Sequence, residues 1–319
     1  MFYGTCRSPT NATNGDAPLL LNDLLHKFEL SLKRRELSPR TVKNYHWALH
    51  DLIGKHMAPD GLVEIADLTR QALEDWQDTQ LERGWAPRSR SLSITAARQF
   101  IKFGAEHDYI TDIKLERSLA KVKQPEAEPH PIPDEDLAKI REHILPLRSD
   151  MTLEELRERA LFCFTLSTGG RVSEVLQPTR ADYVRPRVIQ KGGGPKVLGV
   201  TEKTVEIIGD YLVCRTDDSP VLFVIHAKRR HLEPMNPADV RLVWKKMCKR
   251  LGIPYFTTHA IRHTTATMLL AAGIDHLVIA EHLGHHGVGT IANYAKVGEK
   301  GRQKVLGAMD NLMQLPSAC

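Results

Sequence analysis

Apolar residues recur at helical spacing throughout the first third of the chain. Leucines and aromatic residues follow one another three or four positions apart in four successive segments, which begin near residues 20, 39, 69 and 87. Ser38 and Pro39 suit an N-cap and the first helical position. Gly84 suits the residue just after a helix end. The pattern predicts four packed helices, of which the second stops at Gly54.

Residues 121–136 interrupt this periodicity with prolines and charges. Such a stretch has no apolar face to bury and is typical of a linker. We therefore expect a helical domain at 17–118, a linker at 119–133 and a second domain at 134–319. The polar, turn-rich residues 1–16 are expected to form a flexible N-terminus.

The second domain combines helices with one predicted β-hairpin. A buried helix ends at two glycines, and a short helix starts directly after them at Arg171. The hairpin pairs a strand at Arg187–Gln190 with a return strand at Lys196–Val200 across a glycine-rich turn. Further helices follow at 201–215, 236–251, 258–272, 275–283 and 299–315, with another starting near Thr290, and residues 220–225 look strand-like or buried. The predicted fold class is mainly α, with an N-terminal helical domain and an α+β second domain that holds a small antiparallel β-sheet.

The composition, 42% hydrophobic and 26% charged, is that of an ordinary soluble globular protein. A net charge of +5 fits a nucleic-acid partner, and it fits small anionic ligands equally well. The five cysteines lack CxxC spacing and therefore indicate neither a disulfide framework nor a zinc knuckle. No apolar run approaches the roughly 18 residues of a membrane span, and no secretion signal stands at the N-terminus. We expect a cytoplasmic protein.

Two basic clusters lie at predicted helix starts in the first domain. One includes Arg40 and Lys43, and the other includes Arg88 and Arg90. Cations beside helix N-termini suit the phosphate oxygens of DNA. A solvated charged surface is the alternative for each of these residues. They are candidates for DNA contact.

The stretch 258–294 concentrates the side chains that are able to do chemistry. His259 and Arg262 lie three residues apart, and His263 follows directly, so all three share one side of a predicted helix. An arginine fork beside a histidine suits an oxyanion such as phosphate. A capped helix start with a surface arginine is the alternative.

Three histidines, His282, His285 and His286, surround a glycine in the same stretch. They allow a metal site, and a polar loop with accidental histidines is the alternative. The pair His259 and His263 could also hold a metal in principle, but no cysteine or carboxylate nearby completes such a site. Tyr294 follows His285 by nine residues, and a lone tyrosine after a loop is usually a packing residue.

Four segments taken together resemble the tyrosine recombinase (phage integrase) family: TGGRVSEVLQP, VIQKGGGPK, THAIRHTTATMLLAAG and HLGHHGVGTIANY. They follow one another in the order found in that family, over roughly residues 134–296. The joint match is specific, whereas each segment alone is weak. The first domain, with its S-P-R-T-x-x-x-Y pattern, looks like the family's core-binding domain. By this resemblance the catalytic residues are Arg171, Lys191, His259, Arg262, His285 and Tyr294.

The resemblance implies how a phosphodiester is cleaved. Arg171 and Arg262 clamp the scissile phosphate, and Tyr294 attacks it to form a 3′-phosphotyrosyl bond. Glu174, three residues after Arg171, supports that arginine. The covalent bond conserves the energy of the broken link, so no metal, cofactor or ATP is implied.

The other implied roles concern protons and hydrogen bonds. Lys191 protonates the leaving 5′ oxygen, His259 assists proton transfer from the tyrosine, and His285 hydrogen-bonds the phosphate. The chain departs from the family's pattern at this hairpin, where Gln190 replaces a glycine and three glycines form the turn. Lys196 therefore remains a rival to Lys191.

The implied activity is site-specific recombination of double-stranded DNA, for integration, excision or resolution of a DNA element. It requires a tetramer on two duplexes, associated with the nucleoid when bound. The helix at 299–315 packs either on a neighbouring subunit or on its own domain. A type IB topoisomerase or hairpin resolvase is the alternative on the same scaffold, and a catalytically silent DNA-binding protein is the alternative from another class.

Overall fold

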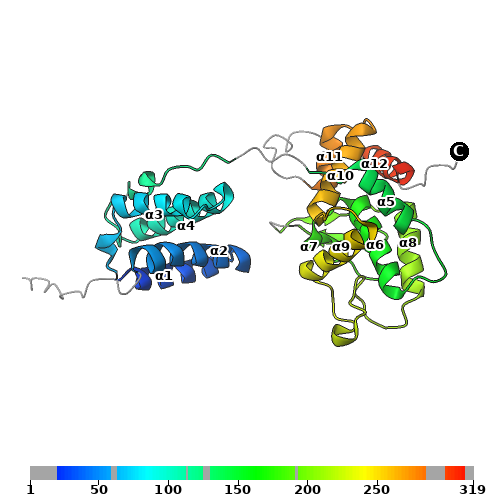
Figure 1. Ribbon diagram of the computed structural model, residues 1–319, viewed down its shortest axis with the longest axis horizontal. Coiled ribbons are helices and arrows are strands. Elements are labelled where there is room, and N and C mark those ends of the chain that lie inside the picture. Colours follow the sequence, from blue (N-terminus) through cyan, green and yellow to red (C-terminus); the bar gives the residue numbers. More distant parts are fainter. Residues whose placement is uncertain are drawn as a thin grey trace, which may run out of the picture. The chain divides into compact units, whose positions relative to one another are not determined.

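The computed structural model describes residues 20–58, 63–112, 114–124, 130–190, 193–284 and 299–312. The chain divides into two compact units, Met1–Ala127 and Glu128–Cys319 (Figure 1). Each unit has its own hydrophobic core. None of the helices in these ranges combines the length and the apolar character needed to cross a membrane.

The described part of the N-terminal unit contains four α-helices, as the periodicity predicts. They are α1 (Leu21–Arg34), α2 (Pro39–His50), α3 (Arg70–Glu82) and α4 (Pro87–Glu106). Ser38 is the N-cap of α2, and its hydroxyl accepts a hydrogen bond from the backbone of Thr41. Short 3-10 turns, η2 (Ile65–Asp67) and η3 (Leu115–Ser118), complete the unit.

The predicted stop at Gly54 is wrong. Helix α2 continues into a π-helical segment, η1 (Asp51–Met57). Leu52 and Ile53 are buried in the core, so this turn stays helical in order to keep both side chains inside. Gly54 is absent from the described glycines with positive φ, and therefore does not end the helix in the left-handed conformation.

A buried polar group anchors η1 to α3. Trp76 is fully buried, and its Nε1 donates a hydrogen bond of 3.0 Å to a carboxylate oxygen of Asp51. The other oxygen of Asp51 pairs with Arg83 at 3.2 Å. Both oxygens of this buried carboxylate are therefore satisfied, as burial of a charge requires.

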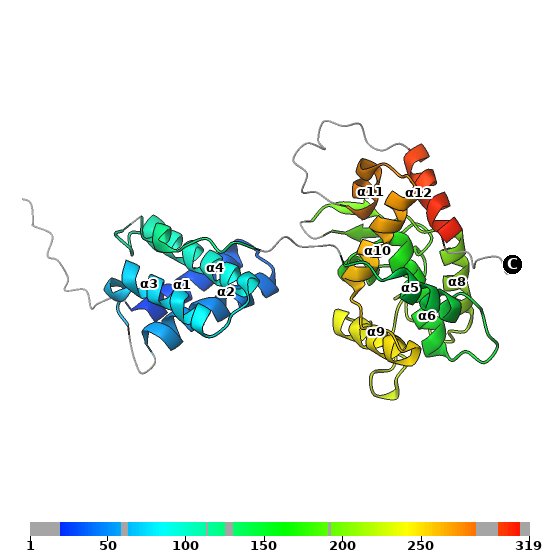
Figure 2. The same ribbon diagram turned by 45° about the horizontal axis from the view of Figure 1, so that its top comes forward.

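The C-terminal unit is built around α6 (Leu153–Thr168), whose residues are all buried from Leu156 to its end. Helices α8 and α10 pack against it. The surrounding helices can be followed in Figures 1 and 2. They are α5 (Asp134–Ile144), α7 (Val172–Val175), α8 (Glu202–Val213), α9 (Pro237–Leu251), α10 (Thr258–Ala271), α11 (His276–Leu283) and α12 (Glu299–Leu312), with a 3-10 turn η4 (Lys228–Arg230).

The predicted hairpin is present, with a shorter return strand. Strands β1 (Arg187–Ile189) and β2 (Pro195–Val197) are antiparallel, and Val188 faces Lys196. The return strand was expected at Lys196–Val200. It starts at Pro195, since a proline is tolerated as the first residue of a strand. It ends at Val197, where the chain turns into the core and buries the side chain of Leu198.

Residues 220–225 form no regular strand. They make single bridges, Thr179 with Val221 and Val224 with Pro234. The side chains of Leu222, Phe223 and Val224 in this segment are nevertheless buried, as its composition indicates.

Helix α12 packs on its own unit, against α10 and α11 (Figures 1 and 2). Val305 and Met309 are buried there, and the carboxylate of Asp310 accepts a hydrogen bond from the backbone of Lys203. Of the two packing alternatives, the structure therefore contains the one within the same chain. The helix expected near Thr290 lies outside the described residues.

Candidate active site

A glycine turn between α6 and α7 positions Arg171. Gly169 ends α6 with φ +54°, and a Cβ built on it would lie 2.3 Å from a methyl carbon of Leu283 on α11. Only glycine fits both the conformation and the space. The chain reverses at this point, and Arg171 becomes the N-cap residue of α7.

Glu174 holds Arg171 in place. One carboxylate oxygen accepts the backbone N–H of Arg171 at 3.2 Å, and the other accepts its Nη1 at 2.8 Å. The carboxylate is fully buried, whereas the side chain of Arg171 is 33% exposed. The guanidinium is therefore fixed at one end and open to a ligand at the other.

Arg262 comes from α10 and is buried, so the alternative of a surface arginine is wrong. Its Nη1 donates to the carbonyl of Gly169 at 2.7 Å, while its Nη2 is buried without a hydrogen-bond partner among the described residues. The pKa of Arg262 is lowered to about 10, chiefly by burial and also by the positive charge of Arg171, against the opposing effect of Glu174. The guanidinium stays charged at neutral pH, and its free donor suits an anion.

His259 lies one turn before Arg262 on α10 and is exposed. Its ring meets the ring of His263 edge to face, with centroids 4.5 Å apart. The pKa of His263 is lowered by burial, by Arg262 and by His130. The predicted helix is confirmed, and His259 lies at its open end while Arg262 points inward.

Lys196 of β2 is the hairpin lysine that the structure describes. Its Nζ is buried and has no hydrogen-bond partner among the described residues. The charges of Glu174, Arg262 and Arg171 all act on it. No feature of the sequence marks this burial, because the strand pattern around Lys196 is only partly apolar.

His282 on α11 faces α6. Its Nε2 donates to the carbonyl of Ser167 at 3.1 Å. Burial, followed by the charge of Lys196, lowers its pKa to about 4, so the ring is neutral at neutral pH. Within the described ranges, no three His, Cys, Asp or Glu side chains form a group that would hold a metal ion. Lys191, His285, His286 and Tyr294 lie outside the described residues.

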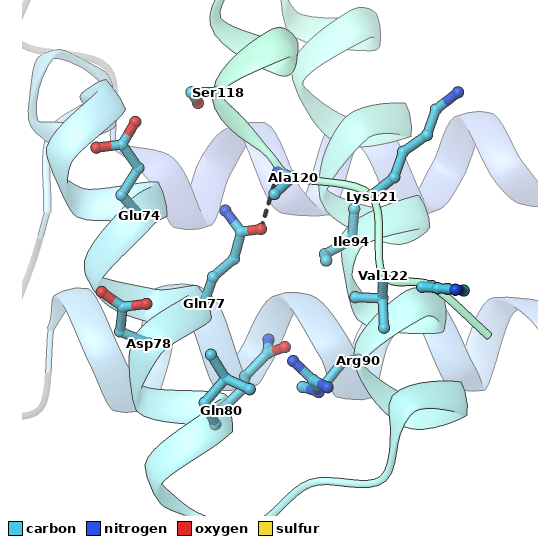
Figure 3. A pocket seen from close by; sticks show the side chains of 12 residues that line it. Glu74, Gln77, Asp78, Gln80, Arg90, Ile94, Ser118, Ala120, Lys121 and Val122 are labelled. Carbon is cyan, nitrogen blue, oxygen red and sulfur yellow. Dashed lines mark hydrogen bonds between the residues drawn. The ribbon is translucent and has the colours of Figure 1, made fainter. Parts of the chain in front are cut away.

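The DNA-contact candidates differ in exposure. Arg40, Lys43 and Arg88 are exposed on the N-terminal unit, whereas Arg90 is partly buried. Arg90 lines a cavity of about 580 Å³ between α3, α4 and residues 118–123 (Figure 3).

The amide group of Gln80 also lines this cavity and has no partner among the described residues. Gln77 holds the neighbouring segment by accepting the backbone N–H of Ala120 at 2.9 Å (Figure 3). The described lining contains no histidine, cysteine or tyrosine, so the cavity offers no tyrosine nucleophile and is no candidate for the reaction that the resemblance implies.

Comparison with known proteins decides the family. The model of the phage integrase family matches residues 138–300, more than half of the chain, and the model of the phage integrase N-terminal SAM-like domain matches residues 25–107. The chain belongs to the phage integrase family, the tyrosine recombinases. The prediction of an enzyme of this class, acting in site-specific DNA recombination, is confirmed at that level.

Relatives of this recombinase cover most of its length. Tyrosine recombinase XerA of Pyrococcus furiosus is 28% identical over 289 residues, which are 88% of this chain and 92% of the relative. Tyrosine recombinase XerC of Shewanella oneidensis is 26% identical over 298 residues, 90% of this chain and 92% of the relative.

Solved structures confirm the fold class. A lambda integrase tetramer bound to a Holliday junction matches with a TM-score of 0.67 at 19% identity, over 93% of this recombinase and 86% of that chain. A lambda integrase dimer bound to a COC′ core site matches with a TM-score of 0.65 at 17% identity, over 88% and 81%.

Proposed function

We propose that this recombinase breaks and rejoins DNA strands at a specific site through a covalent bond between Tyr294 and the 3′ phosphate of the cut strand. The observation that supports this most is the arginine pair at the Gly169 turn. Arg171 is held by a buried carboxylate, and Arg262 keeps one buried donor without a partner. Two fixed guanidinium groups fit the non-bridging oxygens of a phosphodiester.

The reaction proposed for this site is an in-line displacement. The hydroxyl oxygen of Tyr294 attacks phosphorus, and the bond from phosphorus to the 5′ oxygen breaks. His259 assists removal of the tyrosine proton, and Lys191 gives a proton to the leaving 5′ oxygen. Attack by the 5′ hydroxyl of another strand reverses the step and frees the tyrosine. The number of phosphate ester bonds is unchanged throughout, so no ATP is consumed.

The remaining residues support this step. Glu174 keeps Arg171 oriented through its two hydrogen bonds, and His285 hydrogen-bonds the phosphate. Arg40, Lys43, Arg88 and Arg90 contact the DNA backbone from the N-terminal domain, which we place at residues 17–118. The lambda integrase tetramer on a Holliday junction supports the proposal that four copies of this recombinase act on two duplexes.

Trapping of a covalent adduct tests the proposal. A duplex selected from a random pool by binding to a Tyr294→Phe variant is nicked close to the cleavage point, so that the released fragment diffuses away. The wild type should accumulate a covalent protein–DNA adduct, whereas Tyr294→Phe should bind the duplex and form none. Cleavage by this variant would refute the proposal. Relaxation of supercoiled plasmid that lacks the selected sequence would favour a type IB topoisomerase instead.

A further inference from the structure

The steps proposed above leave Lys196 without a role. Its side chain leaves β2 and ends in a buried ammonium nitrogen without a hydrogen-bond partner among the described residues. Burial of a charged donor without a partner costs free energy of folding. A group kept in that state beside a reaction site is a candidate for ligand binding.

Charged and titratable groups surround Lys196 from three elements. Arg171 and Glu174 act on it from α7, and Arg262 acts on it from α10. Lys196 in turn lowers the pKa of His282 on α11. Since Arg171 and Arg262 belong to the candidate phosphate site, the ammonium of Lys196 belongs to the same cluster.

Gly284 provides the space for the end of this side chain. A Cβ built on Gly284 would lie 3.2 Å from Nζ of Lys196 and 2.8 Å from the amide oxygen of Gln190. Gly284 ends α11 with φ +71° and immediately precedes His285. The side chains of Gln190 and Lys196 therefore end beside Gly284. Two candidate catalytic residues, His285 and Tyr294, follow Gly284 in the sequence.

We propose that Nζ of Lys196 binds a non-bridging oxygen of the scissile phosphate, beside Nη2 of Arg262. Both nitrogen atoms are buried donors without a partner among the described residues, and one tetrahedral oxyanion offers acceptors to both. Three cations and the carboxylate of Glu174 leave the cluster with a net positive charge, which suits the charge that builds up as the tyrosine attacks. The inference rests on the proposed function and gives the hairpin a second substrate-binding lysine, distinct from Lys191.

The charge state of Lys196 fits this role. Its pKa is lowered to about 8, chiefly by burial, with Glu174 opposing the shift and Arg262 and Arg171 contributing to it. The ammonium form therefore predominates at neutral pH and is lost as the pH rises through this value. Bound phosphate, as an anion, raises the pKa again. The rate of cleavage should fall above about pH 8 when the enzyme concentration is too low to saturate the DNA. When the DNA is saturated with enzyme, the fall should occur at a higher pH.

The choice of leaving group distinguishes the roles of the two hairpin lysines, Lys191 and Lys196. Single-turnover cleavage of the selected nicked duplex is compared with that of the same duplex carrying a 5′-bridging sulfur, because a thiolate leaves without a proton. Lys191→Met should recover on the sulfur substrate, since its lost function is proton donation. Lys196→Met should be about 100-fold slower than wild type on both substrates.

Stability and chemical rescue distinguish a role of Lys196 in the site from a purely structural role. If Lys196 serves the site, Lys196→Met should keep or raise the melting temperature, because an unpartnered ammonium is removed. Lys196→Cys alkylated with 2-bromoethylamine, which restores an ammonium, should regain at least a tenfold rate, with wild type treated identically as the control. The pH at which the rate of the alkylated variant declines should be lower than for wild type, because thialysine is a stronger acid than lysine.

Three results would overturn the inference. They are Lys196→Met cleavage within a few-fold of wild type, recovery of Lys196→Met on the sulfur substrate, and a slow variant that melts early and is not rescued by alkylation. Failure of the wild type itself to form a covalent adduct would instead refute the proposed function on which the inference rests.

Discussion

Nη1 of Arg262 donates a hydrogen bond of 2.7 Å to the carbonyl oxygen of Gly169. The contact joins α10 to the turn that ends α6, two residues before Arg171. The guanidinium of Arg262 thus fastens the turn that carries Arg171, and its Nη2 remains without a hydrogen-bond partner among the described residues. The relative position of the two arginines depends on this bond.

Replacement of Arg262 by lysine should separate charge from geometry. Lysine keeps the positive charge, but it cannot bond the Gly169 carbonyl and a phosphate oxygen with the fixed fork of arginine. Covalent trapping by Arg262→Lys should be slower than wild type by about 100-fold or more. Arg241→Lys, at an exposed position of α9, is the matched control and should react at the wild-type rate. Equal rates for both variants would show that the fork is not needed.

A methyl group at Gly169 should destabilise the C-terminal unit. The added Cβ meets Leu283 at 2.3 Å on a backbone with φ +54°, so Gly169→Ala should cost about 3 kcal/mol. The stability of this unit is measured separately by urea unfolding, with hydrogen exchange of peptides from α6 as the signal. Gly209→Ala in α8, where a Cβ meets nothing within 4 Å, should instead stabilise by up to about 1 kcal/mol. A loss of stability at both positions would contradict the steric explanation.

The partly buried histidine His282 makes the stability of the C-terminal unit dependent on pH. Its pKa is about 4 in the fold and about 6.5 in an unfolded chain. Between these values the unfolded chain binds more protons, so stability falls as the pH falls below 6.5. Acidification from pH 7 to pH 5 should cost about 2 kcal/mol through this residue.

The matched variants for this prediction are His282→Gln and His26→Gln, the latter at an exposed position of α1. His226, whose pKa is also lowered to about 4, chiefly by burial, adds the same trend to every variant. The difference between variants therefore isolates His282. His282→Gln should lose less stability than wild type from pH 7 to pH 5 in urea unfolding. An unchanged loss would exclude His282 as a source.

The basic residues of α2 should contribute through DNA phosphates. The double variant Arg40→Ala, Lys43→Ala should lower the slope of log affinity against log salt concentration by about 2, because each lost phosphate contact releases one counterion fewer. The control is Lys102→Ala on α4, an exposed lysine that pairs with Glu106 at 3.7 Å. Fluorescence anisotropy with the selected duplex measures the slopes. Equal slopes for the double variant and wild type would remove both residues from the interface.

Local signals made most of the helices predictable from the sequence. Ser38 with Pro39 and Asn236 with Pro237 start helices, and Gly273 follows the end of α10, as their residue types indicate. The continuation of α2 through Gly54 was not predictable, because the buried position of Leu52 and Ile53 outweighs the local propensity of a glycine.

The geometry of the site was harder to predict from the sequence. The residues alone left Arg262 open between a surface position and an anion site, and only the resemblance joined it to Arg171. The bond between Arg262 and Gly169 and the buried ammonium of Lys196 depend on contacts across 93 residues and on a hairpin folded against α11. Spacing along the chain carries no signal for such contacts.

The central claim is that Tyr294 becomes covalently joined to DNA in the site of Arg171 and Arg262. The direct measurement is peptide mapping by mass spectrometry of the adduct trapped on the nicked duplex, after digestion of protein and DNA. The account predicts a nucleotide on Tyr294, joined through a 3′ phosphate, and a free 5′ hydroxyl on the released strand. A nucleotide on any other residue, or a 5′-linked nucleotide on Tyr294, would contradict it.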